Sequence, residues 1–132
     1  IVALRKMSSV EVHKDSDNVV EVNFSRKGAD PALAAAREYL VKLKRLTVDL
    51  GATDVTDAGL KNLNGLTNLQ SLFLINTNIT DAGLKHLKGL TSLEELSLSR
   101  TNVTDEGVKK LQKALPNCDI IYPRTAAVDP CW

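Results

Sequence analysis

A segment of this chain recurs every 24 residues, and this spacing limits the fold more than any other feature. The sequence TDAGL at Thr56–Leu60 returns at Thr80–Leu84, and it returns as TDEGV at Thr104–Val108. Leucines around it keep the same register, for example at Leu63, Leu87 and Leu111. A unit of 24 residues cannot bury a core alone, so such units are stable only when they stack on neighbours. The spacing therefore predicts a stacked array.

Each unit combines a helical pattern with an extended one. The helical half has leucines at steps of three, at Leu84, Leu87 and Leu90. Thr80 or Asp81 is suited to cap the first turn of this helix, and Gly89 lies where the helix should end. In the extended half, Leu96 and Leu98 alternate with polar residues, as in a strand with one buried face. We therefore expect a short helix and a strand in every unit.

Composition narrows the class of protein further. The 132 residues have the size of one domain, which we assign to 1–132, and the net charge of +1 predicts no nucleic-acid partner. Nineteen of the 20 leucines lie between Leu33 and Leu115 and supply the core in place of aromatic residues.

No apolar run reaches the ~20 residues of a transmembrane segment. Because the chain opens with Ile-Val-Ala-Leu-Arg, we expect an excised domain or a mature product.

The run from Leu93 to Asp105, LEELSLSRTNVTD, resembles the leucine-rich repeat. The TDAGL half is similar to the cysteine-containing subtype of F-box-associated and many bacterial repeat proteins, although Thr replaces the usual Asn or Cys of the ladder, at Thr53, Thr77 and Thr101. The resemblance covers about residues 19–123. It implies an α/β right-handed solenoid with about five parallel strands on its concave side and short helices on its convex side. Nothing resembles the F-box helices, so a ligase role is not implied.

The two ends of the array should differ from its middle, because terminal units act as caps. We expect an N-terminal cap at 1–18, repeats at 19–123 and a C-terminal cap or tail at 124–132. A short helix is predicted at 2–8. Val10–His13 should pair antiparallel with Val19–Phe24 across the turn at Asp15–Asn18. At the other end, Ile120 and Tyr122 predict a final strand, with the tail to Trp132 folded over its edge.

The first strands leave the register open. Val22 and Phe24 lie 24 residues before Leu46 and Val48, but the step from there to the next strand pair, at Leu72 and Leu74, is 26. That step implies two extra residues near 49–51. In the alternative register Val48 and Leu50 form the strand pair, and Leu46 is shifted into a bulge.

An Ala-rich helix is expected between the first two of these strands. Asp30 is the predicted cap and Pro31 the first helical residue, and the helix should run to about Lys42.

The outward residues of the strands form the candidate binding surface. By alternation the outward row comprises Glu21, Asn23, Ser25, Arg45, Thr47, Asp49, Ser71, Phe73, Ile75, Glu95, Ser97, Ser99, Asp119 and Ile121. Phe73 and Ile75 stand out because an apolar centre with a polar rim is typical of a protein-binding hot spot. We therefore predict that a partner contacts Arg45, Thr47, Ser71, Phe73, Ile75, Glu95, Ser97 and Arg100. In the alternatives, Phe73 lies flat on its neighbours or another domain of the parent protein covers it.

Other features support rival functions less well. A lysine stripe on the convex side could bind anionic surfaces, at Lys61, Lys85, Lys88, Lys109, Lys110 and Lys113. The acidic row at Asp57, Asp81 and Asp105 is better explained by helix capping than by calcium.

No catalytic residues, cofactor or metal are predicted. His13 and His86 lie far apart in repeat register, and no basic residue lies within four positions of Cys118. Cys118 and Cys131 are equally compatible with a disulfide and with two thiols. The expectation is a monomeric, non-catalytic interaction module that binds another protein or another domain of its parent chain.

Overall fold

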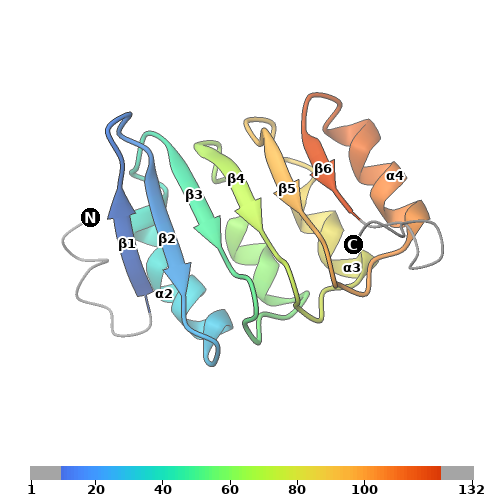
Figure 1. Cartoon of the computed structure of the whole chain (residues 1–132), viewed down its shortest axis with the longest axis horizontal. Coiled ribbons are helices and arrows are strands. Elements are labelled where there is room, and N and C mark those ends of the chain that lie inside the picture. Colours follow the sequence, from blue (N-terminus) through green and yellow to red (C-terminus); the bar gives the residue numbers. More distant parts are fainter. Residues whose placement is uncertain (1–9, 123–132) are drawn as a thin grey trace.

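The structure, a computed structural model, describes residues 10–122. Its sheet has six strands in chain order (Figure 1). From β2 onwards, a helical segment connects each strand to the next. The strands are β1 (Val10–Lys14), β2 (Val20–Phe24), β3 (Leu46–Asp49), β4 (Leu69–Phe73), β5 (Glu95–Ser97) and β6 (Asp119–Ile121). The helices are α2 (Ala29–Leu40), the 3₁₀ helix η1 (Gly59–Leu63), α3 (Asp81–Leu84), the 3₁₀ helix η2 (Lys85–Leu87) and α4 (Asp105–Ala114). The helix expected at 2–8, the tail at 124–132 and Cys131 lie outside the described residues.

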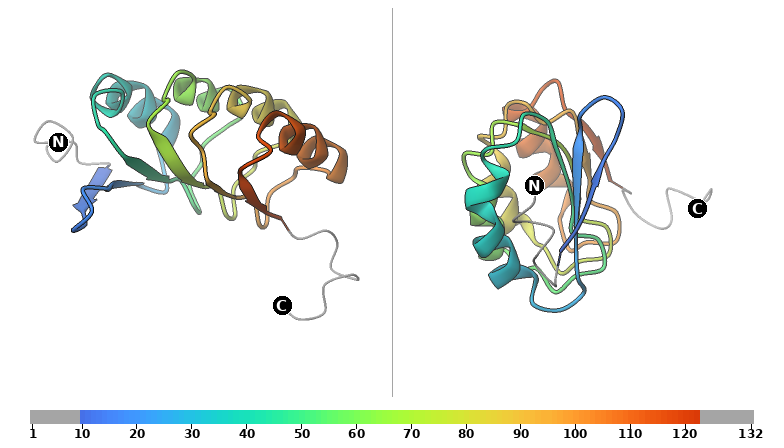
Figure 2. Two further views of the ribbon diagram at one scale, coloured as in Figure 1. Left: turned by 90° about the horizontal axis from the view of Figure 1, so that it is seen from above. Right: turned by 90° about the vertical axis from the view of Figure 1, so that its left-hand side faces the viewer.

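The sheet is mostly parallel. β2 to β6 pair parallel, which confirms five parallel strands, and β1 pairs antiparallel with β2 as predicted. All helices of the described residues cover the same face of the sheet, so the chain forms two layers (Figure 2). None of these helices is long and apolar enough to cross a membrane.

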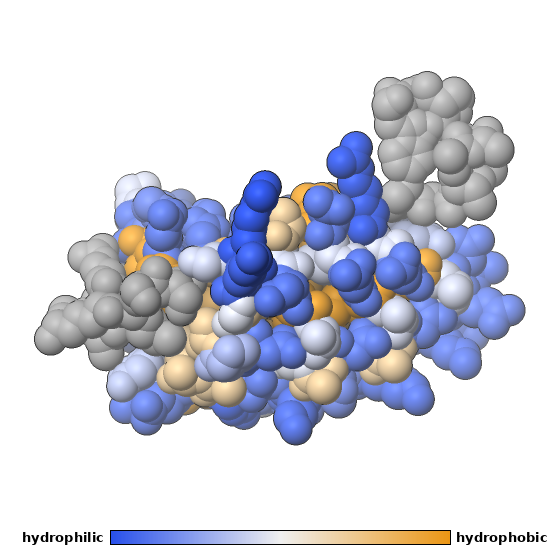
Figure 3. Space-filling model, turned by 90° about the horizontal axis from the view of Figure 1, so that it is seen from below, coloured by the Kyte–Doolittle hydropathy of each residue, from blue (hydrophilic) through white to orange (hydrophobic). Residues whose placement is uncertain are grey.

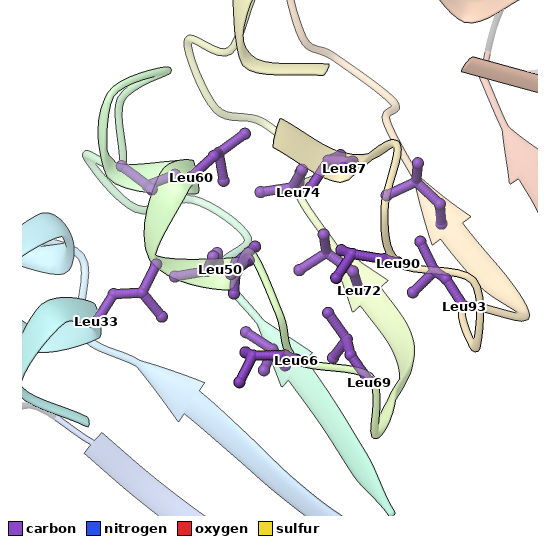
Figure 4. Close-up of a cluster of buried hydrophobic side chains, with 14 of the residues drawn as sticks. Leu33, Leu50, Leu60, Leu66, Leu69, Leu72, Leu74, Leu87, Leu90 and Leu93 are labelled. Carbon is purple, nitrogen blue, oxygen red and sulfur yellow. The ribbon is translucent and has the colours of Figure 1, made fainter. Parts of the chain in front are cut away.

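The core lies between the two layers, and leucine is its main component (Figure 4). Leucines from strands and helices are fully buried there, among them Leu33, Leu50, Leu60, Leu66, Leu72, Leu74 and Leu87. Each strand therefore keeps one face dry and leaves the other free, as the alternation predicts. We call that second face, opposite the helices, the open face.

The register of the early strands favours the alternative that the sequence left open. Val48 pairs with Leu72, a step of 24, and the irregularity falls between Leu46 and Thr47. The predicted step of 26 with extra residues near 49–51 is therefore wrong. The step of 24 before it is also wrong, because Val22 pairs with Val48 across 26 residues. In β2, Val20 and Val22 rather than Val22 and Phe24 therefore pair with Leu46 and Val48. The apolar spacing of the sequence did not reveal this shift of two residues.

Helix α2 begins earlier than predicted and is capped from a distance. It starts at Ala29, so Asp30 is not its cap, and it ends at Leu40, close to the predicted end at about Lys42. The carboxylate of Asp54, 25 residues away, accepts the N–H groups of Gly28 and Ala29 at 3.0 and 2.9 Å. These bonds lower the pKa of Asp54, because the Ala29 and Gly28 N–H groups stabilise the charged carboxylate.

Aspartates join neighbouring units on the helical side. In each case one carboxylate accepts both the backbone N–H and the hydroxyl of a threonine in the next unit. The pairs are Asp30 with Thr56 (2.9 and 2.5 Å), Asp57 with Thr80 (2.8 and 2.6 Å) and Asp81 with Thr104 (2.8 and 2.5 Å). We call these contacts the Asp–Thr braces.

The braces correct the expectation that the acidic row caps helices. The caps are the threonines, because Thr80 accepts from the Ala82 N–H and Thr104 from the Gly107 N–H. The last aspartate of the row, Asp105, accepts instead from the Tyr122 hydroxyl at 2.7 Å.

The glycine of the TDAGL motif makes room for the brace. A Cβ added to Gly83 would lie 2.5 Å from Oδ1 of Asp57 and 3.0 Å from a methyl group of Leu60. Cβ atoms at Gly59 and Gly107 would overlap the carboxylates of Asp30 and Asp81 in the same way. The motif therefore encodes one contact: Asp and Thr form it, and Gly keeps its space free.

The turn after each strand also repeats. Thr53, Thr77 and Thr101 each donate their hydroxyl to the carbonyl three residues earlier, at 2.7–2.8 Å. One position before each of these threonines, the chain takes positive φ angles of 57°, 60° and 58°, at Ala52, Asn76 and Arg100. The hydroxyl closes the turn locally, so Thr can stand where leucine-rich repeats usually carry Asn or Cys.

Replacing Gly83 by Ala should destabilise the protein, whereas replacing Gly89 should not. The new methyl group at position 83 would displace the Asp57 carboxylate, at a cost of about 1–3 kcal/mol. A Cβ added to Gly89 would meet no atom within 4 Å, and the φ of Gly89 is not positive, so Gly89→Ala should stay within about 0.5 kcal/mol of the parent. Urea unfolding of both variants measures the difference. Equal effects at the two glycines would contradict the role of the motif.

Candidate functional site on the open face of the sheet

The strand register arranges the open face in two rows. The first row, in strand order, is His13, Glu21, Thr47, Ser71, Glu95 and Asp119. The second row is Glu11, Asn23, Asp49, Phe73, Ser97 and Ile121. Residues in one row are cross-strand neighbours, on strands that lie about 4.8 Å apart.

The predicted binding residues fall into two groups. Thr47, Ser71, Phe73, Glu95 and Ser97 share the two rows. The remaining three lie at the margins: Arg45 immediately before β3, and Ile75 and Arg100 in the turns after β4 and β5.

Burial differs from the expected pattern at two of these positions. Ile75 is 41% exposed, as predicted, but Phe73 is half-buried and Ser97 is only 4% exposed. Ser97 is small and lies between Phe73 and Ile121 in its row, so its neighbours cover it. The half-buried Phe73 is in line with the alternative in which it lies flat on its neighbours, whereas Ile75 presents its side chain to solvent.

Ile121 adds a third apolar side chain that the predicted site did not include. It is 45% exposed and lies in the same row as Phe73, two strands away. Ile121 lies 48 residues, or two repeat periods, after Phe73, so the repeat spacing could have identified it as a member of the same row. Figure 3 shows the molecule from the side at which β2 to β6 end. On this side, hydrophobic surface lies between projecting hydrophilic side chains.

Two hydrogen bonds hold charged side chains at the margin of the open face. The Asp49 carboxylate accepts from the Gly51 N–H at 2.8 Å, and the Arg45 guanidinium donates to the Asp17 carbonyl at 3.4 Å. Within residues 10–122 one ion pair lies within 4.0 Å, between His13 and Glu11. Most charged groups of the open face therefore point to solvent without a partner in the described part of the chain.

The lysine stripe forms a mixed surface rather than a cationic one. All six of its lysines are exposed. Between α3 and α4, Lys85, Lys88 and Lys110 line a groove of about 150 Å³, but Asp81 and Glu106 line the same groove. These carboxylates offset the attraction that the lysines exert on an anion.

Cys118 and the two histidines do not form a catalytic arrangement. Burial, together with the negative charges of Asp119 and Glu95, raises the pKa of the Cys118 thiol to about 11. His13 lies on the edge strand β1, whereas His86 lies in η2 on the helical layer.

Comparisons with known proteins agree with this geometry. The family model described as leucine-rich repeat matches residues 89–111, which span β5 and the first part of α4, and it supports a leucine-rich repeat there. No curated protein matches the chain. Among solved structures, the chain is similar to a chain in the structure of the Mex67:Mtr2 subunits from Chaetomium. The TM-score is 0.57 at 14% identity, covering 75% of this chain and 78% of that chain, a likeness that shows the fold alone.

The Cys118 thiol should react slowly with alkylating reagents in the folded protein. A Cys131→Ser variant isolates Cys118, and the pH dependence of its iodoacetamide reaction should have a midpoint near 11. In urea the midpoint should return towards the ordinary value of 9.0, so the native thiolate fraction at pH 8 is about 100-fold lower. A native midpoint at or below 9 would contradict the burial of this thiol.

Proposed function

We propose that this protein is a leucine-rich repeat solenoid of the TDAGL, cysteine-containing-like subtype, and that it acts as a non-catalytic protein-interaction module. The partner binds the open face, which corresponds to the predicted concave side. The contact residues are those predicted, Arg45, Thr47, Ser71, Phe73, Ile75, Glu95, Ser97 and Arg100, and Ile121 joins them.

The observation that carries this proposal is the apolar centre of the open face. Phe73 and Ile75 lie at and just beyond the end of the central strand β4, and Ile121 lies two strands away. Exposed aliphatic side chains with a polar rim favour protein contact, since their burial releases about 25 cal/mol per Å² of apolar area. Leucine-rich repeats are typically interaction modules, and the family match at 89–111 supports that class.

The rigidity of the frame supports recognition without rearrangement. Backbone pairing on the sheet side and the Asp–Thr braces on the helical side fix each unit against the next. A surface held in this way loses little conformational entropy when it binds. The partner is a separate protein, or another domain of a longer parent chain that would use the same face.

Replacing Ile75 by Ser should weaken partner binding without lowering stability. Ile75 is 41% exposed, so its loss removes contact area from the complex and little packing from the free protein. The partner is first captured by the intact protein and purified, and dissociation constants are then measured by calorimetry. We expect at least a tenfold weaker complex for Ile75→Ser, and a larger loss for Phe73→Ala.

Val41→Ser is the matched control. Val41 is 45% exposed, like Ile75, but it follows α2 on the helical layer. If Val41→Ser weakened the complex as much as Ile75→Ser, or if Ile75→Ser left the affinity unchanged, the open face would not be the binding surface.

A further inference from the structure

Two carboxylates lie side by side on the open face with no cation beside them. The register pairs Glu95 of β5 with Asp119 of β6, on strands about 4.8 Å apart. No Lys or Arg of residues 10–122 comes within 4.0 Å of either. Like charges in a cross-strand pair destabilise a sheet, so this pair opposes folding.

The pair belongs to a wider charge asymmetry. Among the described residues, five carboxylates point to the open face from the strands, at Glu11, Glu21, Asp49, Glu95 and Asp119. The strand positions in the two rows include no Lys or Arg, although the whole chain carries a net charge of +1. The arginines near this face lie beyond the strands, Arg45 before β3 and Arg100 after β5. The strand positions of the open face therefore carry negative charge around the apolar centre.

Apolar side chains adjoin the carboxylate pair. Along each strand the next outward residue after Glu95 is Ser97, and after Asp119 it is Ile121. Phe73 lies on the other side of Ser97. The small Ser97 thus separates two large apolar side chains, directly beside two unpaired negative charges. This arrangement is complementary to a basic side chain next to a large apolar one.

We propose that the partner presents a Lys or Arg side chain beside a large apolar side chain. The cation binds between Glu95 and Asp119, and the apolar group packs against Phe73 and Ile121, whose side chains cover Ser97. This inference rests on the proposed function of the open face and names the chemistry of its partner. Binding a cation relieves the repulsion between the two carboxylates, so the charge pair that weakens the free protein strengthens the complex.

Two neutralising variants test the cost of the pair in the free protein. Glu95→Gln and Asp119→Asn keep the shape of each side chain and remove one negative charge. Each should raise the melting temperature by about 1–5 °C, because the like-charge repulsion is lost. Glu38→Gln is the matched control, since it removes one exposed charge from the helical layer, outside the first turn of α2. Glu95→Gln and Asp119→Asn melting below the control would overturn the proposed repulsion.

Two peptides test the partner chemistry directly. Both have twelve residues with the same Leu and Phe content, and one carries Arg where the other carries Glu. Amide NMR shifts are followed up to millimolar peptide in the intact protein. We expect the Arg peptide to shift residues of β4, β5 and β6, to bind at least tenfold more weakly to the double variant Glu95→Gln/Asp119→Asn, and to weaken with salt. Glu38→Gln/Glu106→Gln, with the same net charge, should bind like the parent.

The outcomes separate this inference from the proposed function. If the Glu peptide binds the open face equally well, or if the double variant binds the Arg peptide like the parent, the cationic partner is wrong. In that case a loss on Ile75→Ser still supports the open face as the binding surface. If the Arg peptide shifts only the helical layer, or shifts nothing, the cationic partner is also wrong. The proposed function itself fails if Ile75→Ser leaves the natural complex unchanged, or if Val41→Ser weakens it as much.

Discussion

The hydrogen bonds from a threonine N–H and hydroxyl to the aspartate of the preceding unit are the contacts on which the rest of the structure depends. Parallel pairing joins the units on the sheet side, but the helical side has no backbone ladder. There the three Asp–Thr braces join units, alongside the bonds of Asp54 to the start of α2 and of Arg37 to the Asn62 carbonyl. Each brace uses both oxygens of one carboxylate. Charge-assisted hydrogen bonds of this kind are shorter and stronger than neutral ones. With both sides fixed, the leucines between them pack in one register.

The 24-residue spacing predicted a stacked array of helix and strand units, and the resemblance to leucine-rich repeats implied the α/β class with about five parallel strands. The antiparallel strand at the N-terminal end was predicted from its alternation and the turn at Asp15–Asn18. The spacing could not predict the partner of each aspartate, because a brace joins residues 23–26 positions apart and Asp beside Thr also fits a local cap. The start of α2 was misplaced for the same reason, since its cap comes from Asp54 rather than from Asp30. Contacts between units are set by stacking, which the sequence of a single unit does not reveal.

The positions of the proposed contact residues on the sheet were predictable from alternation, and their burial was less so. Alternation placed Phe73 on the face away from the helices, and the strand register agrees, whereas Ile75 lies in the turn just beyond β4. Alternation could not predict that Ser97 is covered, because this depends on the large side chains of two neighbouring strands. Nor did it single out the pairing of Glu95 with Asp119. Cross-strand register decides that contact, and register is a property of the assembled sheet.

A double-mutant cycle between Asp57 and Thr80 tests most directly whether the braces hold the units together. Unfolding free energies of Asp57→Ala, Thr80→Ala and the double variant should give a coupling energy of about 0.5–2 kcal/mol. Asp57→Ala combined with Thr104→Ala is the reference cycle, because Thr104 binds Asp81 instead, and there the two effects should add within about 0.5 kcal/mol. If the Asp57–Thr80 coupling were no larger than that of the reference cycle, the braces would not be what joins one unit to the next.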